Sequence, residues 1–453
     1  MHRMPSSRHC GYRLRVHRSE PEDERPLGPW HVAAVVIGAM VGVGIFFTPA
    51  TLARAVPDAE WVLGIWVLGG VASVAGALVF ADLGARWPQA GGLYVFLREG
   101  FGKPTGSALS FLYGWLQLLV VQPGAMAVIA LVLVDHLAFV SGPMGPVARS
   151  AGACAAIAVF TAANLLGLRV GGRIQIGMAA LKLAALGALA LVGACWGSAS
   201  RVFAEPNVPA APQGTMASWL LFGIIPVLFT YGGAYHGTFI AGSVRDPERS
   251  LPRGIIAAIS VVMVAYLGVN VAYLALLGHA GLAASTSPAA DAVSFALGAL
   301  AGKVLALTIV VSAAGLLNTV CLGFPFVIYA MAKDGVFFER AGRLDPRTGR
   351  PSFAVALQGT LACIAVLVGS SRIDVLLTGI AFADATFQAA IAVVRLRAAP
   401  GMTRYAPPAA AWTFLLIQTG IALGCLFRAP VQSAYGAGAL VVGAMVWFSW
   451  RRA

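Results

Sequence analysis

The stretch His31-Val-Ala-Ala-Val-Val-Ile-Gly-Ala-Met-Val-Gly-Val-Gly-Ile-Phe-Phe-Thr-Pro-Ala50 organises the chain, and the run contains no acid, lysine or arginine until Arg54. It is long enough to cross a bilayer as a helix, which takes about 20 apolar residues. Its middle, however, contains Gly38, Gly42 and Gly44. Each glycine weakens a helix by about 1 kcal/mol relative to alanine. Two interpretations follow: close packing of a neighbouring helix on small residues, or an interrupted helix whose bare backbone binds a small solute.

The composition is that of a membrane protein. Of the 453 residues, 59% are hydrophobic and 11% are charged, and the mean hydropathy is +0.82. A soluble protein carries about 25% charged residues. The net charge of +13 is therefore interpreted as a record of membrane topology, because basic residues collect in cytoplasmic loops. No nucleic-acid partner is expected.

Apolar runs long enough to span a membrane recur along the chain, and we count twelve. They cover residues 31–53, 61–83, 108–138, 151–168, 176–196, 217–241, 254–278, 304–330, 352–370, 373–394, 410–427 and 431–450. Residues 1–28 lack an apolar core, so they are expected to form a disordered cytoplasmic tail and not a signal peptide.

The distribution of lysine and arginine predicts the orientation. With the N-terminus placed inside, the tail and inside loops hold 24 of these residues, the outside loops hold 6, and Lys182 lies within a span. This bias follows the positive-inside rule. We therefore predict an all-α polytopic protein with 12 transmembrane helices in the cytoplasmic (inner) membrane, with both termini cytoplasmic.

A second interruption lies in the run 217–241, where Pro226 precedes Phe229-Thr-Tyr-Gly-Gly233. Paired broken helices in corresponding positions of two repeats mark the binding site of many transporters. Five spans separate the two breaks, so the second unit is inverted. We predict one repeat over 29–200, a second over 214–398, and two appended helices over 408–450. The pairing favours the binding interpretation of the first break.

The two breaks suit a zwitterion. Unpaired amides at Gly42-Val-Gly-Ile-Phe46, beside the positive end of a half-helix, favour a carboxylate. Loosened carbonyls at Phe229–Gly233 can accept hydrogen bonds from an ammonium group. The simplest abundant zwitterion is an α-amino acid.

These motifs resemble those of the amino acid–polyamine–organocation superfamily, most closely its L-type amino-acid transporter branch. The matching stretches are Gly42–Phe46, Ala81-Asp-Leu-Gly-Ala-Arg-Trp-Pro-Gln-Ala-Gly-Gly-Leu-Tyr94, Asn164-Leu-Leu-Gly-Leu-Arg169, Lys182-Leu183, Phe229–Gly233, Asp246-Pro-Glu-Arg-Ser-Leu-Pro-Arg253 and Ala332-Lys-Asp-Gly335.

The resemblance implies a leucine-transporter-like 5+5 inverted repeat that works by alternating access. It implies that the backbone of helix 1 holds the substrate carboxylate, that helix 6 backbone takes the amine, and that the Phe229 ring gates the site. The predicted substrate-binding residues in the two breaks are Gly42, Val43, Gly44, Ile45, Phe229, Tyr231, Gly232 and Gly233.

Four polar residues within spans extend the predicted site. The resemblance implies that the Lys182 ammonium replaces a sodium ion bound by relatives and ties helix 5 to the first break; the alternative is a lysine snorkelling to the interface. Asp384 is either a proton carrier that couples transport or a hydrogen-bonded packing residue. Gln122 and Asn318 either line the site, as the family's helices 3 and 8 do, or join helices.

We therefore predict a secondary transporter of a neutral amino acid, working as a proton symporter or an exchanger. The family's usual acid after the helix 6 break is missing, because residues 240–243 read Ile-Ala-Gly-Ser. A polyamine or cationic amino acid is the alternative substrate. The absence of HxxxH or HExxH patterns argues against a membrane enzyme. No cofactor or metal is expected, nor a disulfide-linked glycoprotein subunit, because the outer loop 139–150 lacks cysteine.

Overall fold

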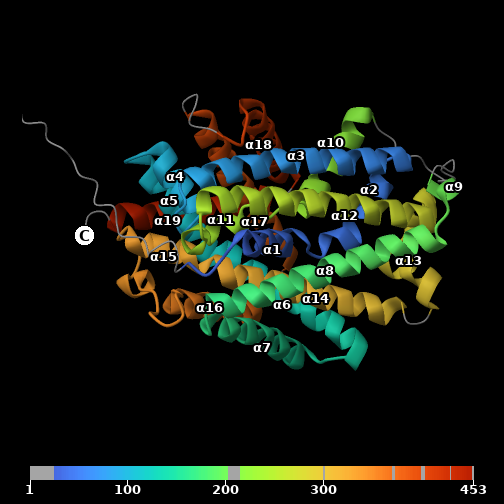
Figure 1. Cartoon of the computed structure of the whole chain (residues 1–453), viewed down its shortest axis with the longest axis horizontal. Helices are drawn as coiled ribbons and strands as arrows, with labels where there is room; N and C mark the ends of the chain where they lie inside the picture. The colour runs from blue at the N-terminus through green and yellow to red at the C-terminus, as the bar shows by residue number, and fades with distance from the viewer. Residues whose placement is uncertain are drawn as a thin grey trace, which may run out of the picture.

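A computed structural model describes residues 25–202, 215–298, 301–369, 373–398, 404–428 and 430–450, and this part of the chain is almost entirely helical (Figure 1). The predicted tail 1–28 lies mainly outside the described residues. The α-helices are α1 (Pro29–Met40), α2 (Gly44–Ala55), α3 (Ala59–Arg86), α4 (Leu93–Phe101), α5 (Thr105–Leu116), α6 (Gln122–Ser141), α7 (Pro146–Leu165), α8 (Leu168–Trp196), α9 (Ala199–Val202), α10 (Met216–Thr230), α11 (His236–Phe239), α12 (Pro247–Ala284), α13 (Pro288–Leu297), α14 (Ala301–Gly323), α15 (Pro325–Lys333), α16 (Ser352–Gly369), α17 (Ile373–Leu396), α18 (Pro408–Arg428) and α19 (Pro430–Trp450).

The sequence marks many of the helix starts. Pro29, Pro146 and Pro247 each stand in the first turn of their helix, where the missing N–H of proline costs no hydrogen bond. The carboxylate of Asp58 caps α3 by accepting the N–H of Trp61 at 2.9 Å. Turn chemistry and apolar length together therefore fix where the chain enters each helix.

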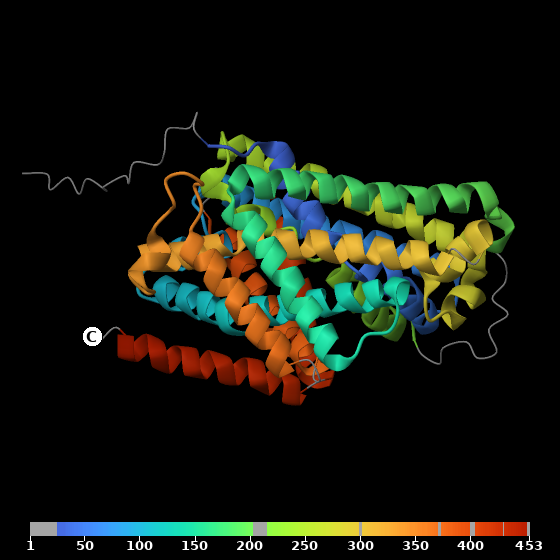
Figure 2. The ribbon, with the colours of Figure 1, turned by 90° about the horizontal axis from the view of Figure 1, so that it is seen from below.

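The long helices run side by side along the longest axis of the molecule. In Figure 1, α3 and α12 lie along this axis and α8 runs at a slant to it, and α12 packs against both of the others. Figure 2 shows α7 and α16 crossing that direction obliquely, packed against each other. The start of α1 and the end of α19 lie toward the same end of the molecule, which also holds α4 and α15 (Figure 1).

Each of the twelve predicted runs overlaps at least one helix of the structure. Among the described residues, seven unbroken helices are long and apolar enough to cross a membrane, and the bent pair α1 and α2 makes an eighth candidate. These findings confirm a polytopic all-helical membrane protein. The count of twelve spans and the inverted repeat stay predictions.

Both predicted interruptions are present. Helices α1 and α2 meet at an angle of 46° across Val41, Gly42 and Val43. Helix α10, which contains Pro226, ends at Thr230, and the chain is not helical again until α11. A π-helical turn, η2 (Gln117–Val121), further interrupts the span formed by α5 and α6.

Two of the quoted motifs meet at the end of the molecule that holds α4 and α15. The Tyr94 hydroxyl donates to Asp334 Oδ2 at 2.8 Å, and the Arg98 guanidinium forms an ion pair with Asp334 at 2.5 Å. Burial, and then the charge of Asp334, raise the pKa of the Tyr94 phenol well above its ordinary value. Burial lowers the pKa of Arg98, but hydrogen bonding to Asp334 and the charges of Asp334 and Glu99 more than offset it and raise the pKa. The ion pair and the hydrogen bond therefore tie α4 to the end of α15.

A second ion pair, between Asp82 and Arg395, joins α3 to α17 and is almost completely buried. Arg395 Nε lies 2.8 Å from Asp82 Oδ2, and the two side chains are 3% and 6% exposed. The other oxygen of Asp82 accepts the backbone N–H groups of Arg404 at 2.8 Å and Tyr405 at 3.0 Å. One carboxylate thus binds three segments of the chain together.

We expect Arg395→Met to lower the free energy of unfolding by about 3–5 kcal/mol, because Asp82 is then a buried charge without a cation. The measurement is denaturant unfolding of the purified protein in detergent. Arg397→Met is the control, since Arg397 is exposed on the same helix end. The double variant Asp82→Asn/Arg395→Met should recover part of the loss. Equal stability of the Arg395 variant and the wild type would contradict the role of the pair.

Candidate functional site

The two breaks lie against each other in the middle of the bundle. A Cβ added to Gly44 would stand 2.8 Å from Thr230 Oγ1, and one added to Gly233 would stand 3.0 Å from the carbonyl carbon of Ala39. Gly233 also has φ +114°, which favours glycine. The hydroxyls of Thr48 and Thr230 share a hydrogen bond of 2.8 Å. The breaks predicted from sequence therefore form one site.

The first break leaves carbonyls without their helical partners, and other helices supply replacements. Lys182 Nζ donates to the carbonyl oxygens of Gly38 at 2.9 Å and Val41 at 2.6 Å. Ser312 Oγ also donates to Val41 O, at 3.0 Å. The Tyr266 hydroxyl donates to Met40 O at 2.7 Å. Side chains from α8, α14 and α12 thus supply hydrogen bonds to three carbonyl groups of the break.

Three backbone N–H groups of the same break, unlike these carbonyls, have no replacement partners among the described residues. Within the part of the chain that the structure describes, the backbone N–H groups of Val43, Gly44 and Ile45 have no acceptor. They stand in sequence at the start of α2, where the helix dipole is positive, and Val43 and Gly44 are partly accessible. The break therefore presents three consecutive free donors beside carbonyls that Lys182, Ser312 and Tyr266 already bond, an arrangement that suits an anionic group.

The second break leaves carbonyl groups without donors in the described part of the chain. The Gly232 N–H turns back to Phe229 O at 3.1 Å, and the His236 N–H bonds Gly233 O at 3.1 Å. Among the described residues, no donor reaches the carbonyl oxygens of Tyr231 and Gly232. Gly232 is exposed. These carbonyls can accept hydrogen bonds from a cationic group.

Lys182 is 2% exposed and its ammonium group faces the break and not the surface. A Cβ on Gly315 of α14 would lie 2.7 Å from Lys182 Cε, so that glycine makes room for the lysine stem. The tie between helix 5 and the first break, expected from the family resemblance, is therefore present as a contact. Its part in coupling stays a prediction.

Asp384 lies in a hydrogen-bonded network and not alone in its span. Its carboxylate accepts from Gln117 at 3.3 Å, Tyr235 at 3.4 Å and Gln388 at 2.5 Å. Gln122, a predicted substrate-binding residue, donates to Gln117 Oε1 at 2.7 Å. Gln122 thus reaches the second break through Gln117, Asp384 and Tyr235, and no hydrogen bond joins it to either break directly among the described residues.

Asn318 occupies a separate network. It donates to Gln175 Oε1 at 2.7 Å and accepts from Asn164 at 2.9 Å, and it is fully buried. Gln175 in turn donates to Ala34 O at 3.0 Å, one turn before Gly38. Asn318, on α14, therefore bonds to α7 and α8, and Gln175 connects it to α1 one turn before Gly38.

The aromatic residues of the second break point in different directions. Tyr231 is 1% exposed, with its ring 5.5 Å from Trp66 and 5.1 Å from Tyr266 between ring centres. Its side chain is therefore part of the packing, and its carbonyl is the group left free. Phe229 is 65% exposed at the end of α10, so its ring is not packed into the core.

Three further side chains donate to carbonyl groups of α1 and of the first break: Tyr266, Ser312 and Gln175. None of them is among the site residues predicted from the sequence. The usable signal was weak: each is a polar residue in a long apolar run, as are many residues that merely join helices. Only the rotation of α12, α14 and α8 about their axes decides which of these side chains reaches the break.

Comparison with known proteins shows the family of the chain. A family model described as amino acid permease matches residues 27–450, which includes both breaks and every helix described above. The chain belongs to the amino acid permease family.

Known relatives of the permease are transporters. It is 27% identical over 400 residues to the serine/threonine exchanger SteT of Bacillus subtilis (strain 168), covering 87% of this chain and 88% of the relative. It is 29% identical over 346 residues to the b(0,+)-type amino acid transporter 1 of Mus musculus, covering 74% and 68%. It is 27% identical over 360 residues to the cystine/glutamate transporter of Homo sapiens, covering 77% and 69%.

Alanine substitutions at two glycines of the first break of the permease should have different outcomes. A Cβ on Gly44 would press on Thr230 Oγ1 at 2.8 Å and Cγ2 at 3.0 Å, whereas the nearest atom to one on Gly42 is Leu316 Cδ2 at 3.7 Å. We expect Gly44→Ala to cost about 1–3 kcal/mol of unfolding free energy through overpacking. Gly42→Ala should change it by less than about 0.5 kcal/mol.

Denaturant unfolding in detergent measures both variants. Adding Thr230→Ala to Gly44→Ala should return part of the loss, compared with Thr230→Ala alone, because it removes the two closest atoms. Equal effects of the two glycine substitutions would contradict the close contact between the breaks.

Proposed function

We propose that this permease moves a neutral α-amino acid across the cytoplasmic membrane by alternating access, as an exchanger. The observation that carries the proposal is the polarity of the first break. The carbonyls of Gly38, Met40 and Val41 accept hydrogen bonds from other helices, while three consecutive amides have no partner among the described residues. We assign these amides, of Val43, Gly44 and Ile45, to the substrate carboxylate, with Gly42 shaping the turn.

The energetics support that assignment. A hydrogen bond to a charged group contributes about 1.5–3 kcal/mol, and the N-terminus of a helix adds about 0.3–1 kcal/mol for an anion. Leaving the amides unbonded in a low-dielectric site is costly. The substrate carboxylate offers four lone pairs to three donors, so a single group can satisfy the break.

The carbonyls of Tyr231 and Gly232 take the substrate ammonium in this proposal. Gly233 keeps them beside the first break through its contact with Ala39. In this proposal, the exposed ring of Phe229 closes the site.

A neutral side chain on the substrate is supported by the state of Asp384. Its carboxylate already accepts from Gln117, Tyr235 and Gln388, so it is poorly placed to pair with an additional cationic group. A cationic amino acid or a polyamine is the alternative, and it would need Asp384 to exchange these amide and phenol donors for the ligand.

The inverted repeat gives the mechanism its geometry. We propose that residues 29–200 and 214–398 are the two repeats, with the broken helices α1–α2 and α10–α11 in corresponding positions. Rocking of these helices against the rest of the bundle would expose the site to each side in turn. The orientation with both termini cytoplasmic is part of the proposal.

Exchange is proposed as the mode because the relative with the greatest coverage reported above is named an exchanger. Lys182 suits this mode: its fixed ammonium bonds the break without an ion that must be carried along. We assign Gln122 and Asn318 positioning parts, through Asp384 and Gln175 respectively. Only Gly142–Gly145 separate α6 from α7, so we propose that the permease works without a disulfide-linked subunit there.

Transport in proteoliposomes tests this function. We expect uptake of labelled L-serine into vesicles loaded with unlabelled L-serine and little uptake into empty vesicles. Competition by leucine or threonine should exceed competition by arginine or putrescine. Accumulation in empty vesicles driven by a proton gradient would instead show symport, with Asp384 as the candidate proton carrier. Failure of every amino acid to bind or move would overturn the proposal.

We expect Lys182→Met to lower the exchange rate at least about tenfold, because two charge-assisted hydrogen bonds at the break are lost and each contributes about 1.5–3 kcal/mol. Methionine keeps the length of the side chain and removes its donors. Lys303→Met is the matched control, since Lys303 is exposed at the start of α14. Normal exchange by a well-folded Lys182→Met protein would contradict the role of the ammonium.

A further inference from the structure

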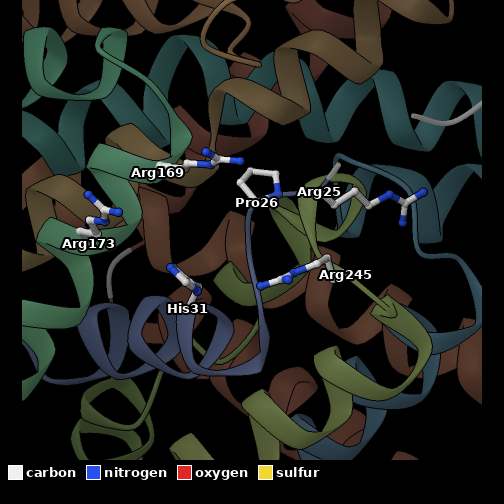
Figure 3. Close-up of a pocket in the computed structure, with 6 residues that line it drawn as sticks. All are labelled: Arg25, Pro26, His31, Arg169, Arg173 and Arg245. Atoms are coloured by element: carbon white, nitrogen blue, oxygen red, sulfur yellow. The ribbon is translucent and has the colours of Figure 1, made fainter. Parts of the chain in front are cut away.

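A basic cavity lies apart from the two breaks, at the start of α1. It has a volume of about 290 Å³ and is lined by Arg25, Pro26, His31, Arg169, Arg173 and Arg245 (Figure 3). Figure 3 shows the side chains of Arg169, Arg173, Arg245 and His31 around one space, with the guanidinium of Arg25 turned away from it. We call this space the basic cavity.

Backbone pairing brings these residues together from three parts of the sequence. Leu27 and Val244 form a parallel bridge, in which the Arg245 N–H donates to Leu27 O at 2.8 Å. On the other side, Gly172 lets α1 approach α8, since an added Cβ would stand 2.9 Å from the ring of His31. The cavity is therefore a built feature of the fold and not a chance meeting of surface side chains.

The charges of the cavity are not compensated. The side chains of Arg169, Arg173 and Arg245 have no ion pair or hydrogen bond with any residue that the structure describes. Among the residues that the structure describes, no carboxylate lines the space; the carboxylate of Asp246, next in sequence to Arg245, lies 4.0 Å from Arg249. Like charges gathered in one concavity raise the free energy of the protein unless an anion joins them.

A histidine nitrogen and two helix N-termini add to the positive character of the same space. His31 Nδ1 accepts the Gly28 N–H at 3.2 Å, so in the neutral ring the hydrogen is on Nε2, which is left to donate. Helices α1 and α8 both begin at the cavity, at Pro29 and Leu168, and their positive ends favour an anion. Guanidinium forks and helix N-termini together match the oxygens of a phosphate group.

Trp30 indicates the depth of the cavity. It is 75% exposed beside Pro29 and His31, and exposed tryptophans collect at the level of the lipid headgroups. Basic pockets between helices at this level suit anionic headgroups.

We propose that the basic cavity binds a phosphate group and that the bound phosphate fastens the start of α1 to α8 and to the segment before α12. The group can come from an anionic phospholipid or from a soluble phosphate. This site is independent of the amino-acid site at the breaks.

The test measures the thermal unfolding midpoint of the full-length protein in neutral detergent, with inorganic phosphate or chloride at equal ionic strength. A specific ligand raises the midpoint by binding the folded state. We expect a phosphate-dependent rise that is lost in Arg173→Gln and in Arg245→Gln. Arg343→Gln is the matched control, because Arg343 is exposed and does not line the cavity. It should keep the full rise, which separates the site from the general salting effect of phosphate.

Nanodiscs identify the source. Discs of phosphatidylcholine with added phosphatidic acid should raise the midpoint over phosphatidylcholine alone, and inorganic phosphate should then add little; this supports a lipid ligand. A rise with inorganic phosphate and none with phosphatidic acid supports a soluble ligand.

Two results would overturn the proposal. One is the absence of a rise with either probe, or an equal rise in the wild type and the Arg173 and Arg245 variants. The other concerns the acidic residues before Arg25: a response that appears only after Glu20, Glu22, Asp23 and Glu24 are changed to amides would mean that the chain itself fills the cavity.

Discussion

The structure depends on the rule that a backbone group inside a bilayer must have a hydrogen-bond partner. The break between α1 and α2 violates helical bonding at several carbonyls and amides at once. The protein satisfies the carbonyls of Gly38, Met40 and Val41 from three other helices, α8, α12 and α14. The amides of Val43, Gly44 and Ile45 have no partner among the described residues. We propose that this division makes a weak point of a helix into half of a binding site.

Small residues make the division possible. Gly44 allows α2 to approach Thr230, and Gly233 allows the second break to approach Ala39. The same glycines that interrupt the helices therefore also bring the interruptions together. Packing and binding, which the sequence alone leaves as alternatives for the first break, are therefore compatible: the close packing is observed, and the binding stays a proposal.

Much of this could be predicted from the sequence. The positions of both breaks follow from Gly42, Gly44, Pro226 and Gly232. The place of Lys182 in an apolar span leaves two alternatives open, and only the family resemblance implies its contact with the first break. These features are local, because glycine, proline and a lone charge alter a helix wherever it packs. The family resemblance likewise rests on short local motifs.

Lateral contacts could not be predicted in the same way. Tyr266 and Ser312 bond the first break only because of how α12 and α14 are rotated, and hydropathy does not record that rotation. Asn318 was expected to line the site, and the structure places it in a network with Gln175 and Asn164. Asp384 and Gln122 prove to be linked through Gln117, a contact between segments that are 267 residues apart in sequence.

The most direct test of the central claim compares binding of L-serine with that of its methyl ester and of ethanolamine, by titration calorimetry on the purified protein. If the free amides of Val43, Gly44 and Ile45 hold the carboxylate, both analogues, which lack that charge, should bind at least about tenfold more weakly than L-serine, because hydrogen bonds to a charged acceptor contribute about 1.5–3 kcal/mol each. Binding of the ester or of ethanolamine as tight as that of L-serine would contradict the account.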